Sequence, residues 1–309
     1  MNVIHDGDHG GDDFLTTIAL LMRPKSFQLL GVTTVHGNIS AKLAANNALK
    51  ACHLVGRDDL NVYSGAEGPI AGATPAGDGA FGDNGIGNAQ FPEPDKHPHL
   101  GQAIHWLIET LSASPQPVTI FATGPLSNIA ELLTARPDVI SKISCLYIMG
   151  GALRAPSGNI TPSAEFNFYM DPVAADTVLA IPELRRVVLT LDATHGFVFG
   201  GEVKEEIFSK IKSKYADQIC KLMMAAEEID GKKFGVDGTF LHDVHTVSAC
   251  IHPSYYEVEE VGLRVVSDSG SDRGSLRLDK MRPATKIITR LRNPDGFRRF
   301  LVDSLYSVP

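Results

Sequence analysis

The chain has 309 residues, 43% hydrophobic and 21% charged, so it can bury a sizeable core in one or two domains. Its formal net charge of −8 argues against nucleic-acid binding, which needs a basic surface. Four scattered cysteines without a C-x-x-C pair, no signal peptide and no apolar run of membrane-spanning length favour a soluble, cytoplasmic protein without a zinc site or disulfides.

Short β-branched segments alternate with amphipathic segments along most of the chain. The first strand is expected at the very start, and the pattern predicts further strands at 27–35, 61–65, 117–124, 142–151 and 185–196. Helices are expected at 40–56 and 100–114, and one long helix at 202–228. The segment 255–291 reads instead as three antiparallel strands with a polar loop.

Alternating strands and helices are typical of a parallel sheet that is covered by helices on both faces. We therefore predict one α/β domain over residues 1–309, with a Rossmann-like, mainly parallel sheet and a small antiparallel excursion near the C-terminus. In such folds ligands bind beyond the carboxyl ends of the strands. The polar clusters DGDHGGDD, VHGN, ATGP, MGGA and DATHG follow expected strands, so we expect them to meet in space.

The segment VIHDGDHGGDDFL, residues 3–15, places Asp6, Asp8, Asp12 and Asp13 within eight positions. Four carboxylates in one short loop repel one another unless a cation offsets their charge. Calcium prefers six to eight oxygen ligands on a flexible loop, whereas magnesium usually keeps more of its water. The loop therefore favours a metal site, with calcium as the first candidate.

Other interpretations of this loop fit less well. An EF-hand would need a glutamate where Thr17 stands, and an aspartyl-phosphatase loop would need threonine or valine in place of Gly10. Asp12 or Asp13 could cap the following helix, but capping accounts for one or two aspartates and not for four.

Seven motifs in order give a more specific interpretation. D-x-D-x-G-x-D-D after a first strand, GVTTVHGN with Asn47 beyond it, FATGPLSN, YIMGGAL, GNITPSAEFNFYMDP, LDATH and LHD together resemble the nucleoside hydrolase family of the inosine-uridine preferring type. The resemblance runs from residue 3 to about residue 245. His9 stands where the family usually has proline, and the loop gives no reason for it.

The resemblance implies calcium-dependent hydrolysis of ribonucleosides to ribose and free base. It assigns the calcium ligands to Asp8, Asp12, Asp13, Asp243 and the main-chain carbonyl of Thr123. Asp8 would also accept the proton of a water held at the ion, and Asn38 would orient both. Taken alone, Asp243 reads as the cap of the helix that follows it.

The resemblance also implies a ribose site and a leaving-group acid. Asn159 and Glu165 would bind the 5′-hydroxyl and Asn167 the 2′ and 3′ side, within a substrate-binding set that includes Met149, Phe166 and Phe81. His242 is the candidate general acid, although a structural imidazole beside a metal ligand is nearly as good an interpretation. For His195 we favour a structural role.

The residues expected around the nucleobase depart from the family pattern. Phe81-Gly82 replaces the usual H-G pair in the loop 78–88, and the segment before LHD has no tyrosine. The only tryptophan, Trp106, lies on an amphipathic segment and is expected in the core, which disfavours a purine-specific indole sandwich. Val244 replaces the usual proline, and the sequence does not name the base.

Two alternatives to a ribonucleoside hydrolase stay open. One is a nucleoside- or ribose-binding homologue with weak or altered activity, because the residues expected around the nucleobase differ from the family pattern. The other is a metal-dependent phosphohydrolase, although D-x-D-x-[TV] is not matched. Related proteins are commonly homodimers or homotetramers, and no nucleic-acid or membrane partner is expected.

Overall fold

A computed structural model describes residues 1–73, 79, 81–154, 156–306 and 308–309. Within these residues one nine-stranded sheet has the order β3-β2-β1-β4-β5-β6-β9-β7-β8. The strands are β1 (Asn2–Gly7), β2 (Gln28–Thr34), β3 (Val62–Ser64), β4 (Val118–Ala122), β5 (Ile143–Met149), β6 (Arg186–Leu189), β7 (Tyr256–Val265), β8 (Leu276–Leu278) and β9 (Ala284–Leu291). Asp78 and Ala80 of the loop predicted at 78–88 lie outside the described residues.

The strand pairing confirms the predicted fold class. Strands β1 to β6 and β9 pair in parallel, while β7 pairs antiparallel with both β9 and β8. The antiparallel excursion is therefore an extension of the main sheet. The first six strands follow the 3-2-1-4-5-6 order of doubly wound folds, in which the crossovers reverse direction between β1 and β4.

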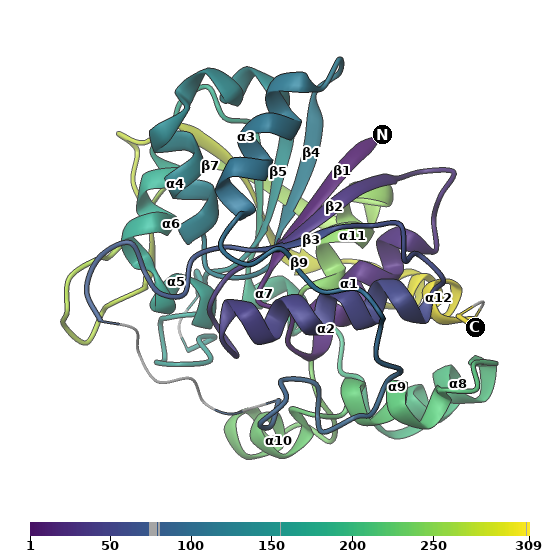
Figure 1. Ribbon diagram of the computed structural model, residues 1–309. Helices are drawn as coiled ribbons and strands as arrows, with labels where there is room; N and C mark the ends of the chain where they lie inside the picture. The colour runs from purple at the N-terminus through teal and green to yellow at the C-terminus, as the bar shows by residue number, and fades with distance from the viewer. Residues whose placement is uncertain (74–78, 80, 155, 307) are drawn as a thin grey trace.

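Helices cover both faces of the sheet (Figure 1). Their bounds are α1 (Gly11–Leu21), α2 (Ala41–Leu54), α3 (Ala103–Ala113), α4 (Ser127–Ala135), α5 (Phe166–Met170), α6 (Pro172–Leu179), α7 (Leu191–Thr194), α8 (Gly201–Lys210), α9 (Ala216–Met223), α10 (Glu227–Phe234), α11 (Val244–Ile251) and α12 (Pro294–Leu305), with 3-10 turns at Pro137–Lys142 and Pro253–Tyr255. None of the described helices is long and apolar enough to cross a membrane.

Two apolar cores, one on each face, hold these layers to the sheet. Alternate residues of a strand point to opposite faces, so Val3 joins the core beneath α1, α2, α11 and α12, and Ile4 joins the core beneath α3, α4 and α6. In β4, likewise, Phe121 lies in the first of these cores and Ile120 in the second. Trp106 of α3 is partly buried against the second of these cores and stacks on Tyr63 with ring centroids 4.7 Å apart.

The single helix predicted at 202–228 is wrong. The chain leaves the helix at Ile211, whose φ of −74° and ψ of 120° are extended, and α9 begins only after Tyr215. The break lets the two halves pack on different helices. Arg298 of α12 pairs with Glu206 of α8 at 2.9 Å, whereas Ile219 and Leu222 of α9 enter the core that α1 shares.

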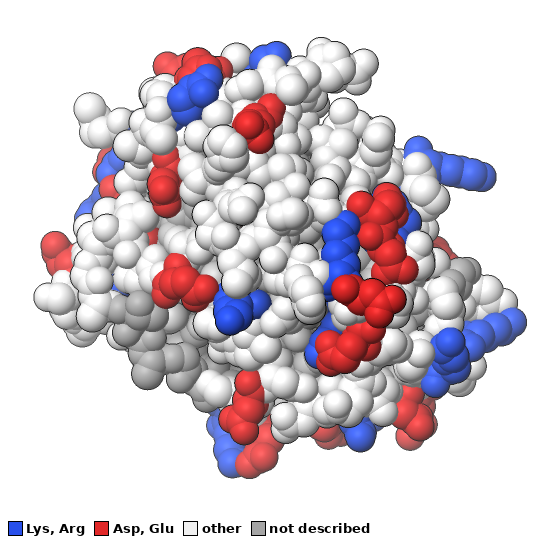
Figure 2. Space-filling view, viewed as in Figure 1, with Lys and Arg blue, Asp and Glu red and all other residues white. Residues whose placement is uncertain are grey.

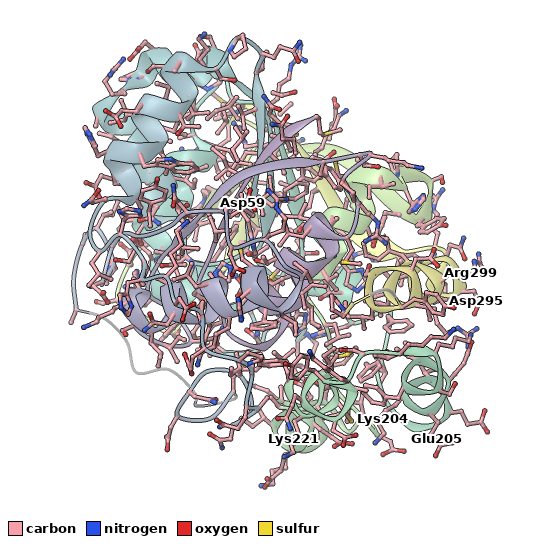
Figure 3. The ribbon with its side chains drawn as sticks, turned by 45° about the vertical axis from the view of Figure 1, so that its right-hand side comes forward. Asp59, Lys204, Glu205, Lys221, Asp295 and Arg299 are labelled. Atoms are coloured by element: carbon pink, nitrogen blue, oxygen red, sulfur yellow. The ribbon has the colours of Figure 1, made fainter. Side chains whose placement is uncertain are left out.

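Helices α8, α9 and α10 form a further layer outside α1 and α2 (Figure 1). Figure 3 shows Asp295 and Arg299 on α12 next to α8, which carries Lys204 and Glu205. Charges of both signs alternate on the face in Figure 2, where the described residues form no broad basic field.

Candidate active site

The acidic loop joins β1 to α1 at the point where the crossovers of the sheet reverse. β1 ends at Gly7, and Asp12 and Asp13 lie in the first turn of α1. Asp243 immediately precedes α11, but its side chain makes no capping hydrogen bond. Asp12, Asp13 and Asp243 are all buried, and each offers an oxygen within 4.8 Å of the others. The three carboxylates therefore form one group, and the capping interpretation of Asp243 is wrong.

Hydrogen bonds hold Asp12 and Asp13 of this group in place. The main-chain N–H groups of His242 and Asp243 donate to Oδ2 of Asp12 at 2.7 and 3.1 Å. The hydroxyl of Thr123 donates to Oδ1 of Asp13 at 2.5 Å. The other oxygen of Asp13, Oδ2, is buried without a partner among the described residues. A buried, unpartnered carboxylate oxygen beside two further carboxylates fits a cation.

Asp8 lies beside this group and is held by the loop that follows β2. The main-chain N–H of Asn38 donates to Oδ2 of Asp8 at 2.6 Å. A Cβ atom on Gly37 would lie only 1.9 Å from the same oxygen, so this approach requires glycine. Asn38 thus orients Asp8 through its backbone, while its side chain lies over Gly10.

The negative charge of these buried, neighbouring carboxylates must be neutralised, either by bound protons or by a cation. Burial, followed by the charge of Asp13, raises the pKa of Asp8 well above its ordinary value. Burial and the charge of Asp12 raise the pKa of Asp243 in the same direction. Burial raises the pKa of Asp13 to about 7. A divalent cation would stabilise the charged forms of all these carboxyls.

Asn167 of α5 bridges the ends of β4 and β5. Its Nδ2 donates to the main-chain oxygens of Thr123 and Met149 at 3.0 and 3.1 Å. The carboxamide oxygen makes none of these bonds, so Oδ1 is the atom of Asn167 that can bind a ligand.

Glu165 and Asn159 shape the next part of the pocket. Glu165 caps α5, and its oxygens accept from the N–H groups of Gly151, Asn167 and Phe168 at 2.8, 2.7 and 3.1 Å. Burial raises its pKa to about 7. Oδ1 of Asn159 accepts from the N–H of Phe166 at 2.8 Å. The carboxylate of Glu165 therefore also organises backbone, which the sequence did not indicate.

One pocket contains every predicted site residue except Asp13, which lies beneath it. Its lining comprises Asp8, Asp12, Asn38, Phe81, Thr123, Met149, Asn159, Glu165, Phe166, Asn167, His242 and Asp243, together with Ala226, Ile229, Asp230, Lys233 and Phe240. The last five were missed. Four of them recur at helical spacing, from Ala226 to Lys233, and this period indicates a pocket-facing helix that continues past residue 228, where the predicted long helix ends.

His242 reaches the pocket from a fixed position. Its Nδ1 lies 2.7 Å from the hydroxyl of Thr194, and Nε2 takes no part in that contact. His195 packs instead among aromatic rings, with its centroid 4.2 Å from that of Phe240 and 4.7 Å from that of Phe234. Burial lowers the pKa of His195 to about 3, so it is neutral at pH 7, and it does not line the pocket.

Asn47 ties the loop that carries Phe81 to the acidic loop. Its Nδ2 donates to the main-chain oxygens of His9 and Asn84 at 3.2 and 2.9 Å. A Cβ atom on Gly11 would lie 2.6 Å from the ring of Phe81, so the ring rests directly on the start of α1. This contact explains the glycine at position 11.

The chain resembles known proteins over nearly its whole length. Residues 3–298 match the family model described as inosine-uridine preferring nucleoside hydrolase, well beyond the last motif near residue 245. Probable uridine nucleosidase 2 of Oryza sativa subsp. japonica is 33% identical over 90% of this chain and 81% of its own. The pyrimidine-specific ribonucleoside hydrolase RihA of Shewanella sp. (strain ANA-3) is 32% identical over 98% and 95%. A solved plant nucleoside hydrolase, the PpNRh1 enzyme, has a TM-score of 0.90 and 26% identity over 99% of each chain.

Proposed function

Because this chain belongs to the inosine-uridine preferring nucleoside hydrolase family and is a ribonucleoside N-glycosidase, we propose that it works with calcium and with Asp8 as the general base. One observation carries the proposal: in the buried group of Asp12, Asp13 and Asp243, Oδ2 of Asp13 has no partner among the described residues, and this group lies at the floor of the pocket next to Asp8.

The donors at this floor suit a hard cation. Asp8, Asp12, Asp13, Asp243 and the carbonyl of Thr123 would hold it, and all five donors are oxygens. A bound calcium ion would lower the pKa of a water molecule at the floor and help to fix its direction of attack. It would also offset the crowding that raises the pKa of the carboxyls.

Asp8 would take the proton of the attacking water. The N–H of Asn38 holds Oδ2 of Asp8, so the carboxylate keeps one orientation through the reaction. As the C1′–N bond of the nucleoside breaks, positive charge grows on the ribose and the water oxygen bonds to C1′. The water proton passes to Asp8, and the bond electrons leave with the base.

His242 would supply a proton or a hydrogen bond to the departing base. To act as the acid, the ring would carry protons on both nitrogens, with Nδ1 donating to the hydroxyl of Thr194 and Nε2 facing the base. The base that accepts the Nε2 proton leaves neutral, and the proton that Asp8 took from water would afterwards return to His242, so that nucleoside plus water gives ribose plus free base.

The ribose would lie between the acidic floor and α5. Oδ1 of Asn167 can accept from the 2′- or 3′-hydroxyl, because its Nδ2 is already committed to Thr123 and Met149. Asn159 and Glu165 would bind the 5′-hydroxyl, with Met149 and Phe166 closing the apolar side of the sugar.

For the base we propose a pyrimidine. Two relatives over 30% identical are named as a uridine nucleosidase and a pyrimidine-specific hydrolase. Phe81, Ile229 and Phe240 offer apolar surface at this end, and the described lining contains no tryptophan.

A panel of nucleosides tests the proposal. Uridine, cytidine, inosine, adenosine and 2′-deoxyuridine are incubated with calcium-loaded protein, and released reducing sugar and free base are both measured. We expect uridine or cytidine to give the highest kcat/KM and 2′-deoxyuridine to react slowly. Binding of uridine without release of sugar from any nucleoside would favour the nucleoside-binding alternative.

A further inference from the structure

A line of buried polar side chains runs from the acidic group into the protein. The hydroxyl of Thr123, which donates to Asp13, lies 2.7 Å from Nε2 of His5. Nδ1 of His5 lies 2.8 Å from the hydroxyl of Thr17, and that hydroxyl lies 3.0 Å from Nε2 of His9. The line therefore has five members, contributed by β1, the acidic loop, α1 and the end of β4.

Each member of this line is 0 or 1% exposed. Because water cannot reach these groups, each needs its neighbour for a hydrogen bond, and loss of any one leaves a buried polar atom unpaired. Burial lowers the pKa of His5 to about 3, so its ring is neutral at pH 7 and can both donate and accept. The line ends where the other ring nitrogen of His9 lies 3.2 Å from the carbonyl of Gly7.

The backbone of His9 is adapted to this position. Its φ is +30°, a region that is unusual for residues other than glycine, and its side chain lies fully buried beneath the loop. Proline, the usual residue of the family here, has φ fixed near about −65° and no ring nitrogen that can reach Thr17. His9 is therefore part of a local arrangement that a proline could not form.

We propose that His9 is a positioning residue for Asp13, acting through Thr17, His5 and Thr123. The line holds Oδ1 of Asp13 in place, so that the unpartnered Oδ2 stays directed at the cation site. The inference rests on the proposed function, because it concerns the cation that Asp13 would bind. Partners behind a metal ligand typically change metal affinity by about 10-fold to 100-fold.

Calorimetric titration of chelator-treated protein with calcium chloride tests this inference. Thr17→Val removes the central hydroxyl with little change in shape, and Thr17→Ser keeps it. His9→Asn tolerates a positive φ but is too short to reach Thr17. Thr16→Val is the matched control, because Thr16 is equally buried on α1 but donates to the carbonyl of Asp12 in its own helix.

We expect the calcium Kd to rise about 10-fold to 100-fold in Thr17→Val and His9→Asn, and to stay within about threefold of the parent in Thr17→Ser and Thr16→Val. The double variant Thr17→Val/His9→Asn should be no weaker than the weaker single variant, because both interrupt one line. If Thr17→Val does not fold, the calcium Kd of His9→Asn still tests the inference, because this variant interrupts the line at the end opposite Asp13.

Melting temperatures without calcium separate positioning from a merely structural role. A lower melting temperature with an unchanged calcium Kd in both Thr17→Val and His9→Asn would overturn the inference, and so would an equal loss of affinity in Thr16→Val. If the parent itself binds no calcium, the cation of the proposed function fails first and this inference fails with it. The parent titration therefore distinguishes the two failures.

Discussion

The floor and the wall of the pocket are built in different ways. We call Asp8, Asp12, Asp13, Asp243 and Thr123 the floor, and Phe81, Ala226, Ile229, Lys233 and Phe240 the wall. Every floor residue is at most 5% exposed and follows a strand or begins a helix of the central fold. Much of the wall comes from α10, an eight-residue helix in the outer layer, and Lys233 is exposed.

We infer from this difference that the floor carries the chemistry and the wall selects the base. The floor is fixed by bonds from several strands and helices, so its oxygens are in place before a ligand arrives. The wall depends largely on a short helix and a loop that lie outside the central sheet (Figure 1). Their side chains can therefore change without disturbing the sheet. We expect changes in the floor to abolish turnover and changes in the wall to alter the choice of base.

The largest effect should come from removing the cation. Dialysis against EDTA should abolish hydrolysis and lower the melting temperature, because the buried carboxylates then repel one another. Calcium should restore both, as measured by sugar release and thermal unfolding. Magnesium at the same concentration is the control for ion identity. Full activity after exhaustive chelation would contradict the role assigned to the floor.

Asp8→Asn should be the most damaging floor substitution that preserves shape. Loss of the general base should lower kcat by about 100-fold to 10,000-fold. The melting temperature with calcium should change by only a few degrees, since the remaining carboxylates still form a group. Steady-state kinetics with uridine, together with circular dichroism, measure both. A variant with near-parental kcat would remove Asp8 from the mechanism.

Acidic pH should weaken calcium binding at the floor. The pKa of Asp13 is about 7 in the cation-free protein, and the pKa values of Asp8 and Asp243 are also raised, so the ion must displace protons as pH falls. The raised pKa of Asp13 stabilises the cation-free fold below pH about 4, and this contribution is lost as pH rises through about 7. Calcium should therefore raise the melting temperature more at pH 8 than at pH 5.5.

Calorimetry in two buffers of different ionisation enthalpy checks this prediction directly. The observed enthalpies give the number of protons released per calcium ion, which we expect to be larger at pH 6 than at pH 8. Binding that neither releases protons nor depends on pH would show that the carboxyls are already ionised without the cation.

The smallest effect should come from the wall. Lys233→Met should change kcat/KM by less than about tenfold, and by different amounts for uridine and inosine, with an unchanged calcium Kd. Lys232→Met is the matched control, because Lys232 is also exposed on α10 but pairs with Glu228 and does not line the pocket. Equal losses for all nucleosides, or a weaker calcium site, would contradict the separation of floor and wall.

Sequence patterns and motifs predicted most of the fold and the residues that form the floor. Strand and helix periods reflect which side chains each element buries, so they predicted the parallel sheet and the meeting of its strand ends. The prediction of one long helix was wrong because Ile219 and Leu222 continue the apolar period of α8 across a break in the helix. A helical period cannot tell whether successive turns pack on one neighbour or on two.

By itself, the sequence determined that Asp8, Asp12 and Asp13 lie together after the first strand, because residues close in the chain stay close in space. The resemblance assigned Asp243 to the same group, but only the tertiary structure decided the contacts that these residues make with distant parts of the chain. Asp243 joins from more than 200 positions away, α10 supplies the wall, and His9 connects to Asp13 through β1, α1 and β4. Such contacts depend on how the layers pack on the sheet, and no local pattern records that packing.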